Sequence, residues 1–151
     1  MLGTHPRLIK PKADIHIELK GTPTEVRNAL ETLRHKLTAQ EFAACNAGVL
    51  EIVLAEVLNN VVEHALAGRS DGQIVIACNY ADQCWFVEVR DNGAEMPDSQ
   101  LPDGTMPDLD RDLLDMPEGG FGWGLVRSLA QDIGYQRHST GHNELSFRVP
   151  D

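Results

Sequence analysis

The chain has 151 residues, 42% of them hydrophobic, and its 13 Lys and Arg against 23 Asp and Glu give a formal charge of −10. This length suits one domain with a buried core, and the composition excludes a disordered chain. A net negative surface repels phosphate backbones, so we expect no binding to nucleic acid. Net charge does not exclude a small site for one nucleotide.

The cysteines and the apolar runs indicate a cellular compartment. Cys45, Cys78 and Cys84 have no metal-ligand spacing and an odd count, which argues against a disulfide framework, and we expect Cys78 to pack in a strand. No apolar run reaches the roughly 18 residues of a membrane span, and the N-terminal residues lack the apolar stretch of a secretory signal. We therefore expect a cytoplasmic protein that does not associate with membranes.

The first part of the chain predicts one strand and two helices after an irregular lead-in over 1–12. Residues 14–20 alternate apolar and polar side chains, as a half-buried strand does. A helix-start signal at 22–25 precedes apolar residues at helical spacing, which predicts a helix to about Leu37. A longer helix is expected over about 46–66, because its apolar residues form a wide stripe.

The second part predicts four strands, one helix and a long irregular segment. The strands are expected over 73–78, 84–90, 135–139 and 144–149. Apolar spacing predicts a helix over 122–133 that Gly134 ends. Residues 94–121 are punctuated by prolines and predict a lid, part of which, 109–115, suits a short helix. Adjacent strands predict one α+β domain over 13–151, a two-layer sandwich whose mostly antiparallel, mixed sheet has its helices on one face.

Polar side chains interrupt the apolar stripe of the second helix. Glu56, Asn60 and His64 follow i, i+4, i+8 spacing and share a face, with Asn59 and Glu63 beside them. A carboxylate one turn from an amide suits a hard cation such as Mg²⁺, which takes oxygen ligands. On periodicity alone, the simpler interpretation is the solvated stripe of an amphipathic helix, with His64 in a surface or capping role.

Two further segments allow an ordinary and a functional interpretation. Asp91-Asn92-Gly93 follows a predicted strand, and it forms either a turn or a site where Asp91 accepts a hydrogen bond and Gly93 admits a flat ligand. The glycine cluster at 119–124 precedes a helix and forms either a hinge or a phosphate site of backbone N–H groups. No Lys-Ser/Thr follows the cluster and no strand precedes it, so a P-loop and a Rossmann site fit poorly.

Taken in chain order, these segments resemble the ATP-binding boxes of the GHKL superfamily, which includes gyrase-type topoisomerases, heat-shock chaperones, histidine kinases and mismatch-repair ATPases. Residues 54–65 are similar to its N box, 91–93 to its G1 box and 119–125 to its G2 box. Within the superfamily the chain most resembles the stand-alone anti-sigma-factor serine/threonine kinases of bacterial partner-switching systems. The compact length, the Glu-x-x-x-Asn-x-x-x-His-Ala spacing and the Glu-Gly-Gly-Phe-Gly-Trp run carry this resemblance.

The resemblance implies the GHKL fold, with ATP and Mg²⁺ as cofactors. It implies that Asn60 coordinates Mg²⁺ and that Glu56 acts as general base or orients the attacking hydroxyl. Asp91 would hydrogen-bond the adenine amino group, with Gly93 beneath the ring. The nucleotide-binding set is completed by His64, Gly120, Gly122 and Gly124, whose glycines would let the lid and a helix N-terminus wrap the phosphates.

The implied function is phosphorylation of a STAS-domain anti-anti-sigma protein, with binding of a sigma factor in the alternative state. A homodimer through the sheet region next to the first strand is also implied. Two departures favour an alternative, a non-catalytic nucleotide-binding regulator that sequesters a sigma factor or another partner: Gly124 stands where the family more often has a bulky residue, and the predicted lid is acidic. A detached histidine-kinase catalytic domain is disfavoured, because we expect no separate dimerisation and phosphoacceptor segment in so short a chain.

Overall fold

The computed structural model describes four stretches of the chain, which are 13–39, 47–97, residue 101 and 122–150. Several expectations lie outside these residues: the lead-in at 1–12, Cys45, most of the predicted lid, the short helix at 109–115, and Gly120.

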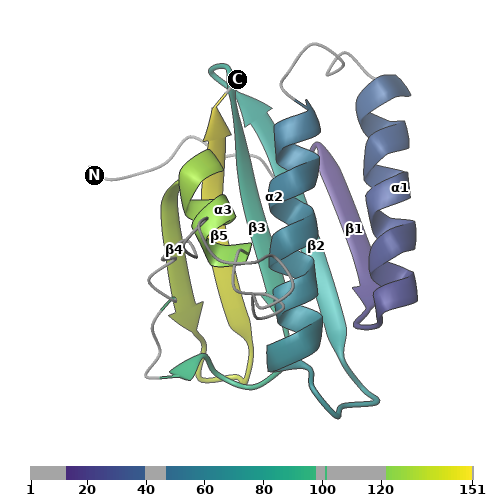
Figure 1. Ribbon diagram of the computed structural model, residues 1–151, viewed down its shortest axis with the longest axis vertical. Helices are drawn as coiled ribbons and strands as arrows, with labels where there is room; N and C mark the ends of the chain where they lie inside the picture. The colour runs from purple at the N-terminus through teal and green to yellow at the C-terminus, as the bar shows by residue number, and fades with distance from the viewer. Residues whose placement is uncertain (1–12, 40–46, 98–100, 102–121, 151) are drawn as a thin grey trace, which may run out of the picture.

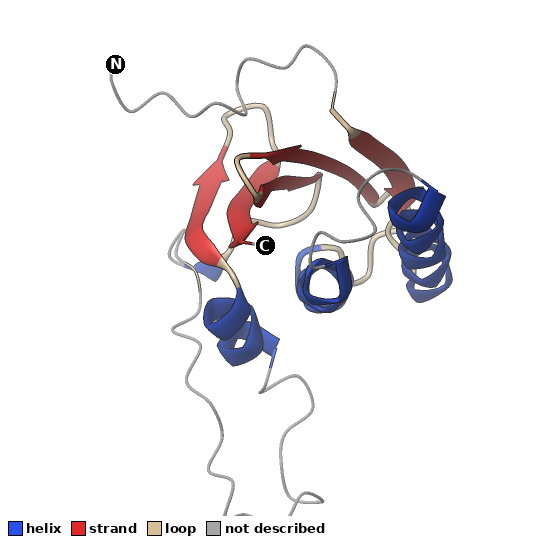
Figure 2. Cartoon of the chain, turned by 90° about the horizontal axis from the view of Figure 1, so that it is seen from above, coloured by secondary structure: helices blue, strands red, loops and turns tan. Residues whose placement is uncertain are grey.

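The described residues form a two-layer α+β sandwich. In chain order its elements are β1 (Ile15–Lys20), α1 (Pro23–Ala39), α2 (Ala47–Asn60), the π-helical turn η2 (Val61–Ala65), β2 (Gln73–Ala81), β3 (Cys84–Asp91), α3 (Gly122–Leu129), β4 (Gln131–Arg137) and β5 (Asn143–Pro150). The strands form one sheet in the order β1-β2-β3-β5-β4, and every neighbouring pair is antiparallel. The helices lie on one face of this sheet (Figures 1 and 2). The predicted fold class is confirmed.

The core lies between the helices and the inward face of the sheet. The strand register aligns buried side chains across four strands, in the row Ile17, Ile76, Val89 and Leu145. Helix α2 lies over the middle of the sheet, and its apolar stripe is fully buried there, which confirms the amphipathic pattern. Burial of apolar surface in this layer is the main force that holds helices and sheet together.

The expected boundary between the last helix and the next strand was wrong. Helix α3 ends at Leu129, where the N–H of Ala130 closes the last turn on the Val126 carbonyl at 2.8 Å. Strand β4 then begins at Gln131, and its pairing with β5 shifts register between Gln131 and Gly134, with Asp132 at a φ of +52°. Gly134 therefore lies inside a strand with a bulge, a common place for glycine, instead of ending a helix.

The hairpin between β2 and β3 is also tighter than the expected loop over 79–83. Strand β2 continues to Ala81, and Asp82 and Gln83 alone form the turn, with φ of +53° and +58°. Two consecutive positive φ values match the right-handed twist of the strands, as in two-residue hairpin turns. Contact between the rings of Tyr80 and Trp85, whose centres lie 5.1 Å apart, extends the pairing beyond the predicted strand.

The fold tests the expectation that Cys78 packs in a strand. Cys78 is free and completely buried in β2, as predicted, and burial raises the pKa of its thiol to about 12. Within the described residues, no helix combines the length and the apolar character that crossing a membrane requires.

The position of α2 over the sheet predicts a contrast between two of its residues. Leu54→Ala is expected to lower the free energy of unfolding by about 2–5 kcal/mol, because it leaves a cavity under a fully buried side chain. Ile52→Ala is the control, since Ile52 is 47% exposed, and it should cost less than about 1 kcal/mol. Urea denaturation followed by circular dichroism measures both, and equal losses would contradict the described packing.

Candidate functional site

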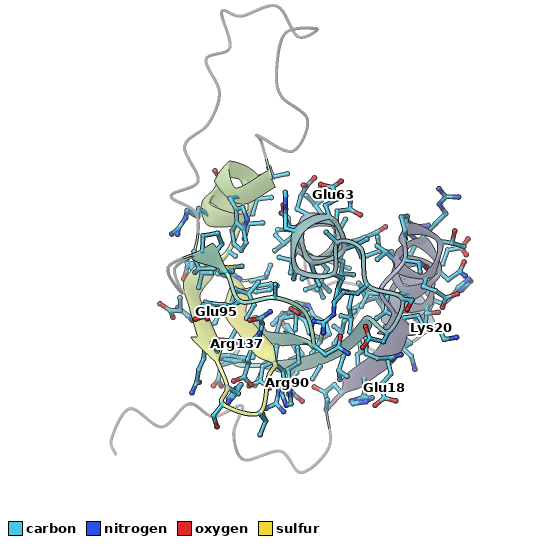
Figure 3. The ribbon with its side chains drawn as sticks, turned by 90° about the horizontal axis from the view of Figure 1, so that it is seen from below. Glu18, Lys20, Glu63, Arg90, Glu95 and Arg137 are labelled. Carbon is cyan, nitrogen blue, oxygen red and sulfur yellow. The ribbon has the colours of Figure 1, made fainter. Side chains whose placement is uncertain are left out.

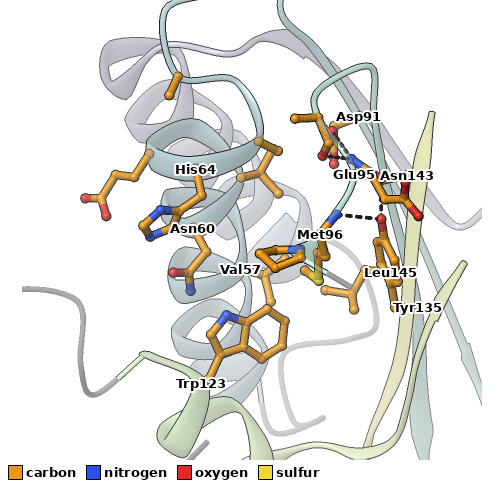
Figure 4. A pocket seen from close by; sticks show the side chains of 16 residues that line it. Val57, Asn60, His64, Asp91, Glu95, Met96, Trp123, Tyr135, Asn143 and Leu145 are labelled. Atoms are coloured by element: carbon orange, nitrogen blue, oxygen red, sulfur yellow. Dashed lines mark hydrogen bonds between the residues drawn. The ribbon is translucent and has the colours of Figure 1, made fainter. Parts of the chain in front are cut away.

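A cavity of about 530 Å³ lies between the end of the central helix and the inward face of the sheet. Helix α2 and η2 form one wall, the ends of β3, β4 and β5 with the segment after β3 form the other, and α3 contributes Trp123 (Figure 4). Its lining residues are Val57, Asn60, Val61, Glu63, His64, Ala65, Ala67, Asp91, Ala94, Glu95, Met96, Pro97, Trp123, Tyr135, Asn143 and Leu145.

The helical wall changes from α to π geometry where it meets the cavity. In η2 the N–H of Leu66 bonds the Val61 carbonyl at 2.9 Å, five residues back. The helix expected over about 46–66 is therefore present, but its last turn is π-helical. The Ala65 carbonyl, at the end of this turn, accepts the N–H of Ala94 at 2.8 Å. Such π turns are rare and are often found at functional sites. This turn joins the helix to the segment that follows β3.

Gly93 is required by this junction. A Cβ at Gly93 would lie 2.3 Å from the Ala65 carbonyl oxygen and 2.6 Å from its carbon, far inside van der Waals contact. Only a residue without a side chain lets the two backbones approach closely enough for the hydrogen bond between Ala94 and Ala65. The structure thus gives Gly93 a packing reason that is independent of any ligand.

Asp91 is a buried carboxylate at the end of β3, with 6% of its surface exposed. Its Oδ1 accepts two hydrogen bonds, from the Gly93 N–H at 2.8 Å and from Asn143 Nδ2 at 2.9 Å. Burial raises the pKa of Asp91 above its usual 3.8, although these hydrogen bonds and the nearby charges of Arg137 and Arg69 act in the opposite direction.

The start of α3 packs directly on the polar residues of α2. A Cβ at the buried Gly122 would lie 3.1 Å from both Glu56 Oε2 and Asn60 Nδ2, which is tighter than ordinary contact. Asn60 Nδ2 donates to the Glu56 carbonyl at 2.8 Å, and Asn60 Oδ1 has no hydrogen-bond partner among the described residues. The structure thus brings Glu56, Asn60 and Gly122 together, with oxygen atoms of the kind that Mg²⁺ prefers.

The other predicted site residues are divided between the cavity and the helix interior. Asn60, His64 and Asp91 line the cavity, and His64 is exposed there. Glu56 is half-buried one turn before Asn60 and does not itself line the cavity. Gly124 is buried within α3, where its carbonyl accepts the Ser128 hydroxyl at 2.8 Å.

The side chains that hold Asp91 in place were not predicted from the sequence. Asn143 is buried, with 4% of its surface exposed, and Tyr135 and Arg137 bond to it from β4. The strands predicted over 135–139 and 144–149 leave Asn143 outside both. It is in phase with the inward residues Leu145, Phe147 and Val149 of β5, and a polar residue on an apolar face was the available signal.

Comparison with solved structures defines the class of fold. The structure of the RsbU and RsbW domains of Rv1364c from Mycobacterium tuberculosis matches with a TM-score of 0.60 and 19% identity, over 90% of this chain and 32% of that longer chain. The catalytic domain of the histidine kinase ThkA matches with a TM-score of 0.51 and 15% identity, over 90% of this chain and 95% of that one. The sandwich is thus the fold of histidine-kinase catalytic domains.

The sequence comparisons identify the family. Residues 19–149 match the model of the histidine kinase-like ATPase domain, and the chain belongs to that family. It is 30% identical over 131 residues to the serine/threonine-protein kinase BtrW of Bordetella bronchiseptica, covering 87% of this chain and 89% of BtrW. This relation confirms the resemblance to the anti-sigma-factor serine/threonine kinases.

The contact between Gly93 and η2 predicts a strong asymmetry between two glycines. Gly93→Ala is expected to lower the free energy of unfolding by about 1–3 kcal/mol, because backbone must move to accept the methyl group. Gly48→Ala is the matched control, since nothing lies within 4 Å of a Cβ there, and it should not lower the free energy of unfolding. Thermal and urea denaturation measure both, and tolerance of Gly93→Ala would contradict the junction.

The buried carboxylate predicts a gain in stability on its neutralisation. Asp91→Asn is isosteric and retains an Oδ1 acceptor for Gly93 and Asn143. Because the folded pKa of Asp91 is raised, its charge costs nothing below the unfolded pKa, and the cost grows as pH rises toward the folded pKa. The variant should therefore have a higher Tm than the wild type at pH 7 and an equal Tm at pH 3. A lower Tm at pH 7 would contradict this account.

Proposed function

We propose that the protein is an ATP-dependent serine/threonine kinase that acts as an anti-sigma factor. Its target would be a serine or threonine of a STAS-domain anti-anti-sigma protein in a partner-switching system. Family membership and the relation to BtrW support this proposal. The observation that carries it is the placement of Glu56 beside Asn60, against Gly122 at the start of α3. Asn60 lies on the helical wall of the cavity, across from Asp91 (Figure 4).

The strand wall suits the adenine base. Both hydrogen bonds that the structure describes for Asp91 end on Oδ1, so Oδ2 is left to accept the amino N–H of adenine. Met96, Trp123 and Leu145 supply apolar surface in the same cavity, as flat rings require. Because Gly93 has no side chain, the backbone would lie close beneath this base.

The helical wall suits the phosphates only together with a cation. The described cavity lining holds three carboxylates, from Glu63, Asp91 and Glu95, and no Lys or Arg. A triphosphate would be repelled by these carboxylates unless its charge is neutralised. Asn60 Oδ1 is the oxygen that would hold Mg²⁺, with His64 at the edge of the same site. Bound Mg²⁺ would supply the positive charge that neutralises the phosphates.

Glu56 is proposed to be the residue that handles the proton. The hydroxyl oxygen of the target serine or threonine would form a bond to the γ-phosphorus of ATP, and the bond from that phosphorus to the β,γ-bridging oxygen would break, releasing ADP. The hydroxyl proton would pass to the Glu56 carboxylate, or, where Glu56 only orients the hydroxyl, to solvent water. Gly122 keeps the start of α3 close to Glu56, so its backbone lies near the phosphates.

Partner binding is proposed to use the surfaces outside the cavity. Among the described strands, β1 is one of the two edge strands of the sheet, and its polar side chains His16, Glu18 and Lys20 are exposed. Figure 3 shows Glu18 and Lys20 on this edge. A free edge can pair with a second strand, which supports the proposed homodimer next to β1. The protein would bind a sigma factor when no STAS protein is bound to it. We propose that this exchange of partners takes place in the cytoplasm.

The kinase proposal predicts that Glu56 matters for transfer and not for binding. With labelled ATP, Mg²⁺ and candidate STAS proteins from the same genome, Glu56→Gln should lower the transfer rate by about 10²–10⁴-fold. Its Kd for ATP should stay within about threefold of the wild type, since no binding role is assigned to the carboxylate. Glu51→Gln, five residues earlier on α2 and paired with Arg34, is the control and should transfer normally.

Two outcomes would contradict the kinase proposal. If the wild type binds ATP but transfers label to no STAS protein, the alternative of a non-catalytic nucleotide-binding regulator is favoured. If isothermal titration finds no binding of ATP or ADP, both proposals fail.

A further inference from the structure

The side chains of Asn143, Arg137 and Tyr135, here called the hairpin network, converge on Asp91 from the β4–β5 hairpin. Asn143 uses all of its hydrogen-bonding capacity. Its Nδ2 donates to Asp91 Oδ1 at 2.9 Å and to the Ala94 carbonyl at 2.8 Å. Its Oδ1 accepts the Tyr135 hydroxyl at 2.6 Å and Arg137 Nη1 at 3.1 Å. The side chain is therefore fixed in one orientation.

Arg137 gives this network its direction. A guanidinium can only donate, so the group of Asn143 that faces Arg137 must be its oxygen. The amide nitrogen then faces Asp91 and makes Oδ1 a permanent acceptor. Any proton on Asp91 must consequently reside on Oδ2, the same atom that a ligand in the cavity would use. Arg137 also lowers the pKa of Asp91, which opposes the effect of burial.

The same three side chains hold the segment that follows β3. Arg137 Nη1 donates to the Gly93 carbonyl at 2.8 Å, Asn143 to the Ala94 carbonyl, and the Met96 N–H donates to the Tyr135 hydroxyl at 3.0 Å. Three backbone groups within four residues are thus bonded to one hairpin. The same side chains therefore fix both the position of the segment 93–96 and the orientation of Asp91, as Figure 4 shows for Asn143 and Tyr135.

We infer that Asn143, oriented by Arg137 and Tyr135, is a positioning residue that makes the cavity selective for a purine with a 6-amino group over one without it. This inference rests on the proposed function. With Oδ1 fully engaged, Asp91 presents one acceptor, Oδ2, to the base. A 6-amino group donates to that acceptor, whereas the 6-oxo group of a hypoxanthine or guanine ring would place an acceptor against it. Selectivity then depends on a residue that does not itself contact the 6-position.

The test compares ATP with purine riboside triphosphate, which differs from ATP only by lacking the 6-amino group. Isothermal titration with Mg²⁺ present gives both Kd values for the wild type and for Asn143→Leu. The variant should weaken ATP about tenfold, the effect of one hydrogen bond to a charged group, and purine riboside triphosphate less than about threefold. Ser146→Ala, on the opposite face of β5, is the matched control and should change neither Kd.

A second variant keeps the inference testable if Asn143→Leu does not fold. Arg137→Met removes the donor that fixes the amide of Asn143 and leaves Asn143 in place, so it should show the same ligand-dependent loss at a smaller size, about threefold for ATP. Circular dichroism and a thermal melt establish folding of each variant.

The other possible outcomes would overturn either this inference or the proposed function. Equal losses for the two ligands, or no loss, would overturn the inference, because a merely structural role weakens both alike. If the wild type binds the two ligands equally, selectivity through Asp91 is overturned while nucleotide binding stands. If the wild type binds neither, the proposed function itself has failed.

Discussion

The hydrogen bond between Asp91 and Asn143 is the interaction on which the site depends. The two residues face each other across β3 and β5, in a cross-strand row that begins with Leu19 and Ile74 and ends at Arg137. The first half of this row is apolar and belongs to the core. The second half is polar, and its residues Asp91 and Asn143 line the cavity, so the core and the strand wall of the cavity are one continuous surface of the sheet. A buried carboxylate in such a place needs fixed partners, and the row supplies them.

The helical wall of the cavity is shaped by the change from α to π geometry at the end of the helix. The Ala65 carbonyl lies at the end of the helix, where carbonyls have no intrahelical partner, and it accepts the N–H of Ala94, a contact that Gly93 is small enough to permit. This backbone hydrogen bond thereby joins the helical wall to the strand wall next to Asp91. A side chain at position 93 would hold the two walls apart. The raised pKa of Asp91 indicates that this arrangement costs stability, which is common where binding groups are preorganised.

Periodicity was sufficient to predict the elements that are regular. The alternation of β1 and the stripe of α2 gave both the sheet and the buried helix face, and three motifs in order gave the family. Periodicity failed where one pattern fits two structures. Leu129 and Ile133 are spaced for a helix, but Ile133 is equally placed for a strand, and the register shift beside Gly134 was decided by pairing with β5.

The candidate site was predictable only in part, for a similar reason. Glu56, Asn60 and Asp91 belong to local motifs that a sequence displays, and the structure brings them to one region. Asn143 carries no motif, and its role comes from lying opposite Asp91 across two strands that are 52 residues apart in the chain. The π turn was equally hidden, because a hydrogen bond shifted by one residue leaves the apolar pattern of the helix unchanged.

The most direct test of this account is a two-dimensional ¹H–¹⁵N NMR titration of the full chain with ATP and Mg²⁺. The account predicts that the side-chain amide of Asn143 and the backbone amides of Gly93, Ala94 and Met96 shift together, while amides of β1 stay in place. Saturating ATP that leaves these four groups unchanged, or shifts centred on β1 and α1, would contradict a nucleotide site in this cavity.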